Sequence, residues 1–209
     1  KVMQVKVLSD THNDHRLHTD LECDILVHCG DYGIKGTYTE CRAFLEWFVK
    51  QPSKYKIVVP GNHDGRIKKN PELSALAREY GIHVLMNDLV VINNKRIWGG
   101  DFVPWYRDNV CQSDLRTRKK AWENMEDNLD LLVTHVPPKG ILDANSRGER
   151  CGCDQLRLAI KQRSIKKHVF GHIHEHGGKV LDKWATKFYN CAVKDINYLT
   201  VRDYKEFII

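Results

Sequence analysis

The sequence lacks any long apolar run, and this absence excludes a membrane-spanning helix. Its longest runs, such as residues 89–92 and 131–133, fall far short of the roughly 18 apolar residues needed to cross a bilayer. Residues 1–9 are too short to hold a secretory signal peptide. With 42% hydrophobic and 29% charged residues, the composition also excludes a collagen-like fibre and an acidic disordered chain. We therefore expect a soluble cytoplasmic protein with no membrane partner.

Cysteine is present but lacks the spacing of a secreted disulfide framework. The seven thiols form an odd set at positions 23, 29, 41, 111, 151, 153 and 191. Cys151 and Cys153 flank one glycine and could chelate a metal or form a strained disulfide, but no second Cys/His pair has zinc-finger spacing, so packing thiols are favoured. Internal repeats and linkers are also missing, and 209 residues suit one domain spanning residues 1–209.

A mild basic excess is compatible with a phosphate-bearing partner. Lys and Arg number 33 against 27 Asp and Glu, a formal net charge of +6. The basic clusters at residues 116–120 and 161–167 fit solvated helix faces equally well, so charge gives only weak support.

Hydrophobic periodicity predicts an α/β protein. Short β-branched runs at residues 5–8, 25–28 and 56–59 each end in a polar loop, and residues 38–50 have helical spacing that suits a crossover between parallel strands. A second helix is predicted over 71–80, with Asn70 as its cap and Gly81 at its end.

The chain after residue 81 predicts a more antiparallel arrangement. Asn93-Asn94 suits a tight hairpin turn, residues 113–128 a helix, and 128–134 and 168–170 buried strands. The tail from 178 to 209 predicts several strands whose inward candidates are Val180, Phe188, Ala192, Leu199 and Val201. The aromatic residues Phe102, Trp105 and Tyr106 could stack a nucleobase, although packing on the core is favoured.

Metal-binding side chains follow five of these strands directly. They are Asp10 and His12, then Asp31, then Asn62, His63 and Asp64, then His135, and finally His172 and His174. Because the carboxyl ends of parallel strands lie along one edge of a sheet, these residues are expected to converge. Carboxylate, imidazole and amide donors without thiolate suit Mn²⁺, with Fe or Zn as other candidates.

These motifs resemble the calcineurin-like metallophosphoesterases over nearly the whole chain. The resemblance rests on Asp10-x-His12, Gly30-Asp31, Gly61-Asn62-His63-Asp64, His135 and Gly171-His172-Ile173-His174, in that order. The stretch 131–143, Cys151-Gly152-Cys153 and residues 168–175 are similar to the small metallophosphoesterase domain-containing branch, whose members are class III-type phosphodiesterases.

The resemblance implies a four-layer αββα sandwich, in which two mixed β-sheets are flanked by helices and two divalent metal ions bind at one end. It further implies that Asp10, His12 and His174 hold the first ion, that Asn62, His135 and His172 hold the second, and that Asp31 bridges both. His63 would contact the substrate phosphate or protonate the leaving group, with Asp64 orienting it. Asn13 and His176 are weaker candidates for substrate binding.

The charge of such a site explains its chemistry. Two divalent ions and two carboxylates leave about +2, which attracts and polarises a phosphate. A hydroxide bridging the two ions is acidified and aimed at phosphorus for in-line attack. These features predict hydrolysis of small or nucleotide-type phosphodiesters, cyclic nucleotides among them.

Three alternatives remain open. A protein phosphatase would carry Gly-Asp-x-x-Asp-Arg-Gly where this chain has residues 30–36, which lack both the second Asp and the Arg that clamps a monoester dianion. A DNA nuclease would need further segments to grip long nucleic acid, which is not a favoured partner. A non-catalytic scaffold would have lost metal ligands, and all seven are present. The oligomeric state is left open.

Overall fold

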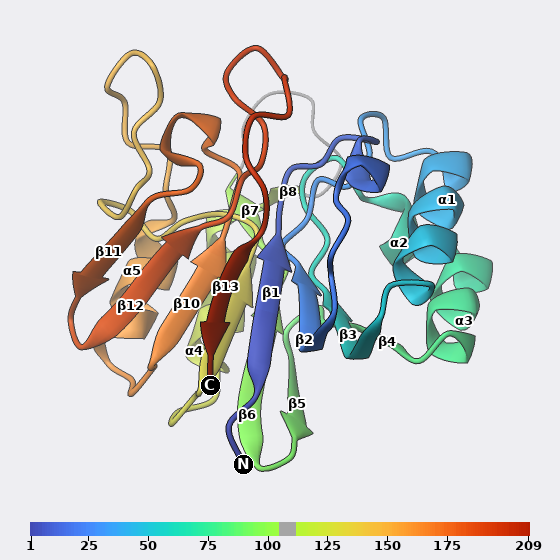
Figure 1. Ribbon diagram of the computed structural model, residues 1–209. Coiled ribbons are helices and arrows are strands. Elements are labelled where there is room, and N and C mark those ends of the chain that lie inside the picture. Colours follow the sequence, from blue (N-terminus) through green and yellow to red (C-terminus); the bar gives the residue numbers. More distant parts are fainter. Residues whose placement is uncertain (105–111) are drawn as a thin grey trace.

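Two mixed β-sheets pack face to face, and helices cover their outer faces (Figure 1). The computed structural model describes residues 1–104 and 112–209. The first sheet has the order β13 (Lys205–Ile208), β1 (Gln4–Leu8), β2 (Cys23–His28), β3 (Ser53–Val58) and β4 (Ile82–Val84). The second has the order β11 (Val180–Lys183), β12 (Thr186–Asn190), β10 (Lys167–Phe170), β9 (Leu131–Thr134), β6 (Lys95–Gly100) and β5 (Asp88–Ile92).

The central strands of both sheets are parallel, which brings their carboxyl ends together. In the first sheet β1, β2, β3 and β4 pair in parallel, and in the second β12, β10, β9 and β6 do the same. The edge strands β13, β11 and β5 pair antiparallel. Parallel β7 (Val103–Pro104) and β8 (Gln112–Ser113) form a separate short ribbon. Loops from both sheets therefore gather at the top of Figure 1, opposite the N-terminus.

Helices complete the four layers, and polar caps define where several of them begin. The first sheet is covered by α1 (Tyr38–Val49), α2 (Arg66–Lys69) and α3 (Pro71–Glu79), and the second by α4 (Leu115–Glu123) and α5 (Asp154–Lys161). Short 3₁₀ turns, η1 (His15–Leu17) and η2 (His174–His176), follow β1 and β10. Asn70 caps α3 by accepting from two backbone amides, as predicted. Within the described residues, we find no helix with the length and apolarity that crossing a membrane requires.

Period-2 alternation in the strands separates the central core from the two outer ones. Val5 and Val7 of β1 lie between the sheets, whereas Leu8 packs in the cluster beneath α1 with Phe44. In β10, Val169 joins the central core and the next residue, Phe170, lies under α4 and α5. The α/β class and the αββα sandwich are confirmed.

The hairpin prediction is confirmed and the tail prediction is partly wrong. Asn93 and Asn94 both have positive φ, 47° and 64°, between the antiparallel strands β5 and β6. In the tail, Phe188 and Ala192 are buried, but Val180, Leu199 and Val201 are exposed. Val180 lies on the edge strand β11, and the other two lie in the loop between β12 and β13, so no neighbouring strand covers them.

Three further predictions can be compared with the structure. The helix predicted over 113–128 is shorter, because α4 covers only Leu115–Glu123 after its cap Asp114. Phe102 packs edge-on against Trp122, with ring centroids 5.6 Å apart, while Trp105 and Tyr106 lie outside the described residues. All six described cysteines are free thiols, with Cys153 buried and Cys151 half-buried; Cys111 is outside the described part.

Candidate metal centre

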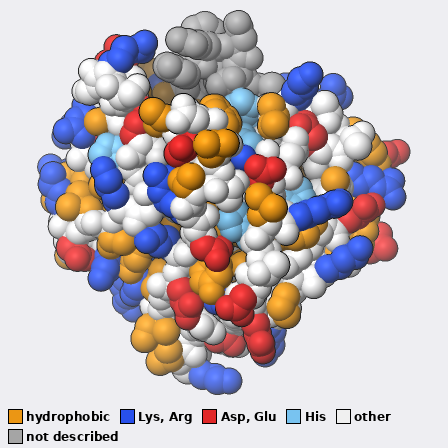
Figure 2. All heavy atoms as spheres, turned by 45° about the horizontal axis from the view of Figure 1, so that its top comes forward, with side chains coloured by type: hydrophobic (Ala, Val, Ile, Leu, Met, Phe, Trp, Pro, Cys, Tyr) orange, Lys and Arg blue, Asp and Glu red, His pale blue; other side chains and the backbone are white. Residues whose placement is uncertain are grey.

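The polar residues predicted at the strand ends do converge at one end of the molecule. Three overlapping groups have ligand atoms within 4.8 Å of one another: Asp10, His12 and His174; His12, Asp31 and His63; and Asp31, His135 and His172. Figure 2 turns this end forward and shows histidine side chains on its surface among apolar ones. His12 is shared by the first and second groups, and Asp31 by the second and third, so the three groups form one continuous cluster.

The first group contains buried polar atoms without a partner. Among the described residues, neither Oδ1 of Asp10 nor Nε2 of His12 has a hydrogen-bond partner, although both side chains are almost fully buried. His174 places its Nε2 3.3 Å from that same Oδ1. Because an unpaired buried polar atom is costly, this arrangement fits a cation held between these three side chains.

The second group centres on the imidazole of His135. Its Nε2 lies 3.2 Å from Oδ2 of Asp31 and 3.0 Å from Oδ1 of Asn62. His172 stands against the same ring, with centroids 5.0 Å apart. An imidazole nitrogen, a carboxylate and an amide oxygen thus face a common point, a donor set that suits borderline divalent cations.

Four of these imidazoles are oriented by backbone carbonyls. His12 donates its Nδ1–H to Gly33, His135 to Cys29 and His174 to Asp195, at 3.0, 2.8 and 2.9 Å. His63 donates in the same way to the carbonyl of Ile34. Since a carbonyl only accepts, each ring carries its proton on Nδ1 and directs Nε2 toward the cluster, the usual arrangement of histidines that bind metals.

Left-handed backbone turns place these side chains over the strand ends. Asp10, His12, Asp31 and His172 have φ values of 56°, 41°, 55° and 67°. Each such conformation costs roughly 1 kcal/mol for a residue with a Cβ, and strain of this kind concentrates at functional sites. Gly171 is required beside them, because a Cβ there would collide with the carboxylate of Asp10 that accepts the His172 amide.

The carboxylates and imidazoles of the cluster shift one another's pKa values. Burial opposes ionisation of Asp31, but the neighbouring His135 outweighs it and holds the pKa of that carboxyl well below its ordinary value. Burial likewise disfavours charge on His135, yet Asp31 raises the pKa of this imidazole to about 10. A divalent cation bound beside Asp31 would compete with a proton for Nε2 of His135.

Asp64 has partners different from the one predicted. Its carboxylate accepts from the backbone amides of Asp31, Gly33 and Gly61, at 2.6, 3.2 and 2.9 Å. The ring of His63 is held by the Ile34 carbonyl, so the prediction that Asp64 orients His63 is wrong. Instead, Asp64 joins the loop after β2 to the loop after β3 and positions the backbone of Asp31.

Comparison with known proteins agrees with this geometry. The family model described as "Calcineurin-like phosphoesterase" matches residues 3–176. The chain belongs to the calcineurin-like phosphoesterase family. Members of this family hydrolyse phosphoesters with the help of a dinuclear metal centre, and the Asp and His clusters of this calcineurin-like phosphoesterase are candidate ligands for one.

Relatives and solved structures share much of its length. Human metallophosphoesterase domain-containing protein 1 is 32% identical over 205 residues, covering 85% of this chain and 62% of the relative. A UPF0046 protein of Caenorhabditis elegans is 30% identical over 208 residues, covering 91% and 69%. The crystal structure of phosphopantetheinyl hydrolase from Mycobacterium tuberculosis is 17% identical with a TM-score of 0.70, covering 93% of this chain and 90% of that one, and shows the shared fold.

A cleft of about 670 Å³ opens beside the metal centre of this phosphoesterase. Asp31, Asn62, His63, His172 and His174 line one side of it. The other lining residues come from four segments: Pro104; Asn145, Ser146, Glu149, Arg150, Cys151 and Gly152; Ile173 and Glu175; and Ile196 and Tyr198. A volume of this size accommodates a nucleotide-sized ligand.

Two residues predicted to contact the substrate lie outside the cleft lining, and two residues of the lining were not predicted. Asn13 is exposed and donates to Glu40 at 2.8 Å, and His176 faces Lys179; neither lines the cleft. Arg150 does line it and is held by the fully buried Asp143 at 2.8 Å. Tyr198 lines it as well, and no local sequence motif singles out either residue.

Proposed function

We propose that this chain is a dinuclear-metal phosphodiesterase acting on small or nucleotide-type diesters, cyclic nucleotides among them. The observation that carries the proposal is the series of three overlapping ligand groups, in which His12 and Asp31 connect the group of Asp10 and His174 to the group of His135 and His172. The proposal treats residues 1–209 as one metallophosphoesterase domain of a cytoplasmic protein.

In this proposal each side chain has a defined part. The first ion would be held by Asp10, His12 and His174, the second by Asn62, His135 and His172, and Asp31 would serve both. Mn²⁺ is the first candidate, with Fe or Zn as alternatives, because the donors are oxygen and imidazole nitrogen. When bound, two such ions acidify water and withdraw charge from phosphoryl oxygens.

His63 is the side chain proposed to act on the substrate. Its Nε2 lies 3.9 Å from Oδ2 of Asp31, its ring is held through Nδ1, and it lines the cleft. A histidine in this position can donate a hydrogen bond to a phosphoryl oxygen or a proton to the leaving group. Asp64 supports it indirectly by positioning the loop that carries Asp31.

The charge of the cleft favours a diester over a monoester. Among the described lining residues only Arg150 carries a permanent positive charge, and Asp143 already balances it. Tyr32, which follows Asp31, is an uncharged side chain that is buried and stacked on Phe44 with centroids 4.1 Å apart, so this position supplies no positive charge to the phosphate. A diester carries one negative charge where a monoester carries nearly two, and therefore needs fewer cations.

The deciding experiment compares two aryl phosphates on one preparation. Chelator-stripped protein is reloaded with Mn²⁺ and assayed with bis(p-nitrophenyl) phosphate and p-nitrophenyl phosphate, with Asp31→Asn as the control for contaminating activity. We expect kcat/KM for the diester to exceed that for the monoester by about tenfold or more. A preference for the monoester would replace the diesterase proposal by a phosphatase.

A further inference from the structure

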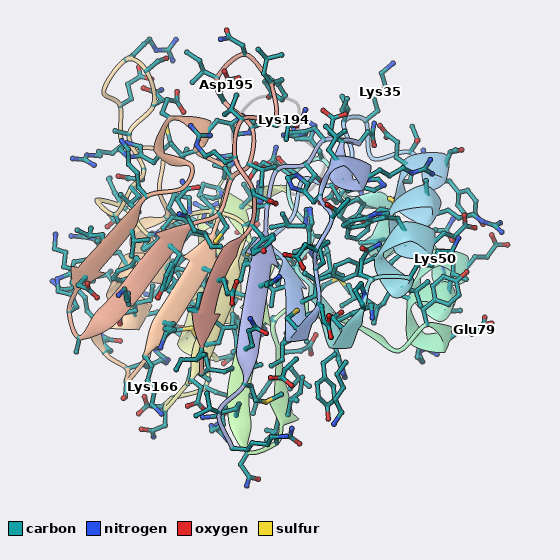
Figure 3. The ribbon with its side chains drawn as sticks, in the orientation of Figure 1. Lys35, Lys50, Glu79, Lys166, Lys194 and Asp195 are labelled. Carbon is teal, nitrogen blue, oxygen red and sulfur yellow. The ribbon has the colours of Figure 1, made fainter. Side chains whose placement is uncertain are left out.

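A tight turn at Asp195–Leu199 projects over the first ligand group and has no part in the proposed ligand set. Figure 3 labels Lys194 and Asp195 in the loop at the top of the molecule, far from Lys166 at its other end. The carboxylate of Asp195 accepts from the amides of Asn197 and Leu199, both at 2.9 Å, and its carbonyl accepts from the amide of Tyr198. The side chain of Asp195 thus defines the shape of the turn.

The turn holds Tyr198 against two candidate metal ligands. The ring centroid of Tyr198 lies 4.9 Å from that of His12 and 5.0 Å from that of His174. The carbonyl of Asp195 is also the acceptor that orients His174. On the far side, the buried ammonium of Lys194 donates to the Tyr198 carbonyl at 2.8 Å. Tyr198 is therefore positioned by the same loop that positions a ligand.

This position is unusual for an aromatic residue. Tyr198 has a φ of 61°, in the left-handed region that a bulky residue rarely adopts. It remains 53% exposed, and Ile196 in the same turn is 57% exposed. Both line the cleft. A strained backbone here presents apolar surface to the space beside the metal ligands.

Apart from Pro104 and the buried Ile173, most of the remaining cleft wall is polar, and several of its side chains already have partners. Glu149 accepts from Arg147 at 2.8 Å, and Glu175 accepts from the amide of Ser146 at the same distance. Arg150 donates to Asp143. A substituent that extends from a phosphoryl group at the metal centre therefore meets exposed apolar surface at the Asp195–Leu199 turn rather than on the opposite wall.

We propose that Tyr198, together with Ile196, binds a planar aromatic substituent of the phosphoester, such as an aryl group or a nucleobase. This inference rests on the proposed function, because it takes the phosphoryl group to lie at the metal centre. Aromatic rings pack favourably on a tyrosine face or edge, and base stacking of this kind tolerates different bases. Tyr198 would then favour phosphoesters that carry an aromatic substituent over those that carry none.

Binding calorimetry on the Mn²⁺-loaded protein tests this directly. The probes are two matched pairs: phenylphosphonate with methylphosphonate, and adenosine 5′-monophosphate with ribose 5-phosphate. We expect the wild type to prefer the aromatic member, and Tyr198→Ala to reduce that preference by about three- to tenfold. Tyr198→Phe should retain it, because the ring remains. Leu199→Ala, an exposed apolar residue of the same turn outside the cleft lining, is the matched control and should retain it too.

The outcomes separate the inference from the proposed function. If Tyr198→Ala reduces the preference for the aromatic member only in the phosphonate pair, the group that Tyr198 binds is a simple aryl group. If it reduces the preference in the nucleotide pair, that group is a nucleobase. If Tyr198→Ala weakens both members of each pair equally, the residue only packs on His12 and His174 and the inference fails. An unchanged preference in Tyr198→Ala overturns it as well. If the wild type binds none of the four and hydrolyses no diester, the proposed function itself has failed.

Discussion

The carboxylate of Asp64 accepts a hydrogen bond from the backbone amide of Asp31 at 2.6 Å. The same carboxylate also accepts from Gly33 and Gly61, so one buried side chain ties together the loops after β2 and β3. Burial and the nearby charge of Asp31 raise the pKa of Asp64 to about 7. The position of Asp31, the proposed shared ligand, thus depends on a buried residue that does not line the cleft.

Removing this acceptor should destabilise the fold. We expect Asp64→Ala to lower the free energy of unfolding by about 3–5 kcal/mol, because several buried amides lose their only acceptor. Asp64→Asn keeps one acceptor oxygen and should cost about half as much. Urea unfolding of the metal-free protein measures both, and equal losses in the two variants would show that the hydrogen bonds are unimportant.

Asp31→Asn should damage both proposed metal sites at once. An amide offers one neutral oxygen where the carboxylate offers two charged ones, so we expect fewer bound Mn²⁺ ions and a kcat/KM lower by about 100-fold or more. Elemental analysis after dialysis gives the metal content. Asp182→Asn, an exposed aspartate on β11, is the control. Full metal content and near-normal turnover in Asp31→Asn would contradict the shared-ligand assignment.

His63→Gln should separate catalysis from metal binding. We expect the metal content to be retained while kcat falls by about 10²- to 10⁴-fold, the range for loss of a general acid. The half-buried His83 on β4 offers a control, His83→Gln, far from the proposed ligands in the sheet order. Loss of metal in His63→Gln would instead place His63 among the ligands, since it groups with His12 and Asp31.

Glu40 should make stability depend on pH. Burial opposes its ionisation, but the Asn13 side chain and the amides of Thr37, Ile34 and Lys35 outweigh this and lower the pKa of Glu40 from 4.5 to about 2. A carboxylate with a depressed pKa stabilises the folded state above pH 4.5, and this contribution disappears as the pH falls through about 2.

Glu40→Gln should therefore be less stable than the wild type by about 1 kcal/mol at neutral pH, a modest loss because the side chain is partly exposed. The free energies of unfolding of the wild type and of Glu40→Gln should become equal as the pH is lowered from 4.5 toward 2. Glu46→Gln, on the same helix and paired only with Arg42, provides the comparison. If the free energies of unfolding of wild type and Glu40→Gln differed by a constant amount over that pH range, the lowered pKa of Glu40 would be contradicted.

Much of the site could be predicted because the end of a buried strand can be recognised in the sequence as the point where an apolar run gives way to polar residues. Asp10, Asp31 and His135 each follow an apolar run directly, and parallel pairing brings such positions to one edge. The prediction failed where partners come from elsewhere in the chain. Asn13 is held by Glu40 on α1, and two of the backbone amides that donate to Asp64, those of Asp31 and Gly33, lie 33 and 31 positions before it.

The tail illustrates a second limit. Phe188 and Val180 were both predicted to point inward, yet Phe188 is buried on the inner strand β12 and Val180 is exposed on the edge strand β11. Periodicity reports which residues share a face, whereas burial depends on what covers that face. Leu199 and Val201 were wrong for the same reason.

The sequence by itself determined the α/β class, the family and the ordered set of residues able to bind metal, because these depend on local periodicity and on motifs at strand ends. Only the tertiary structure decided that four imidazoles are oriented by distant carbonyls, that Asp64 positions Asp31, and that Tyr198 stands beside His12 and His174. Each of these is a contact between segments that are separated in the chain, and such contacts exist only once the strands that carry these loops have assembled.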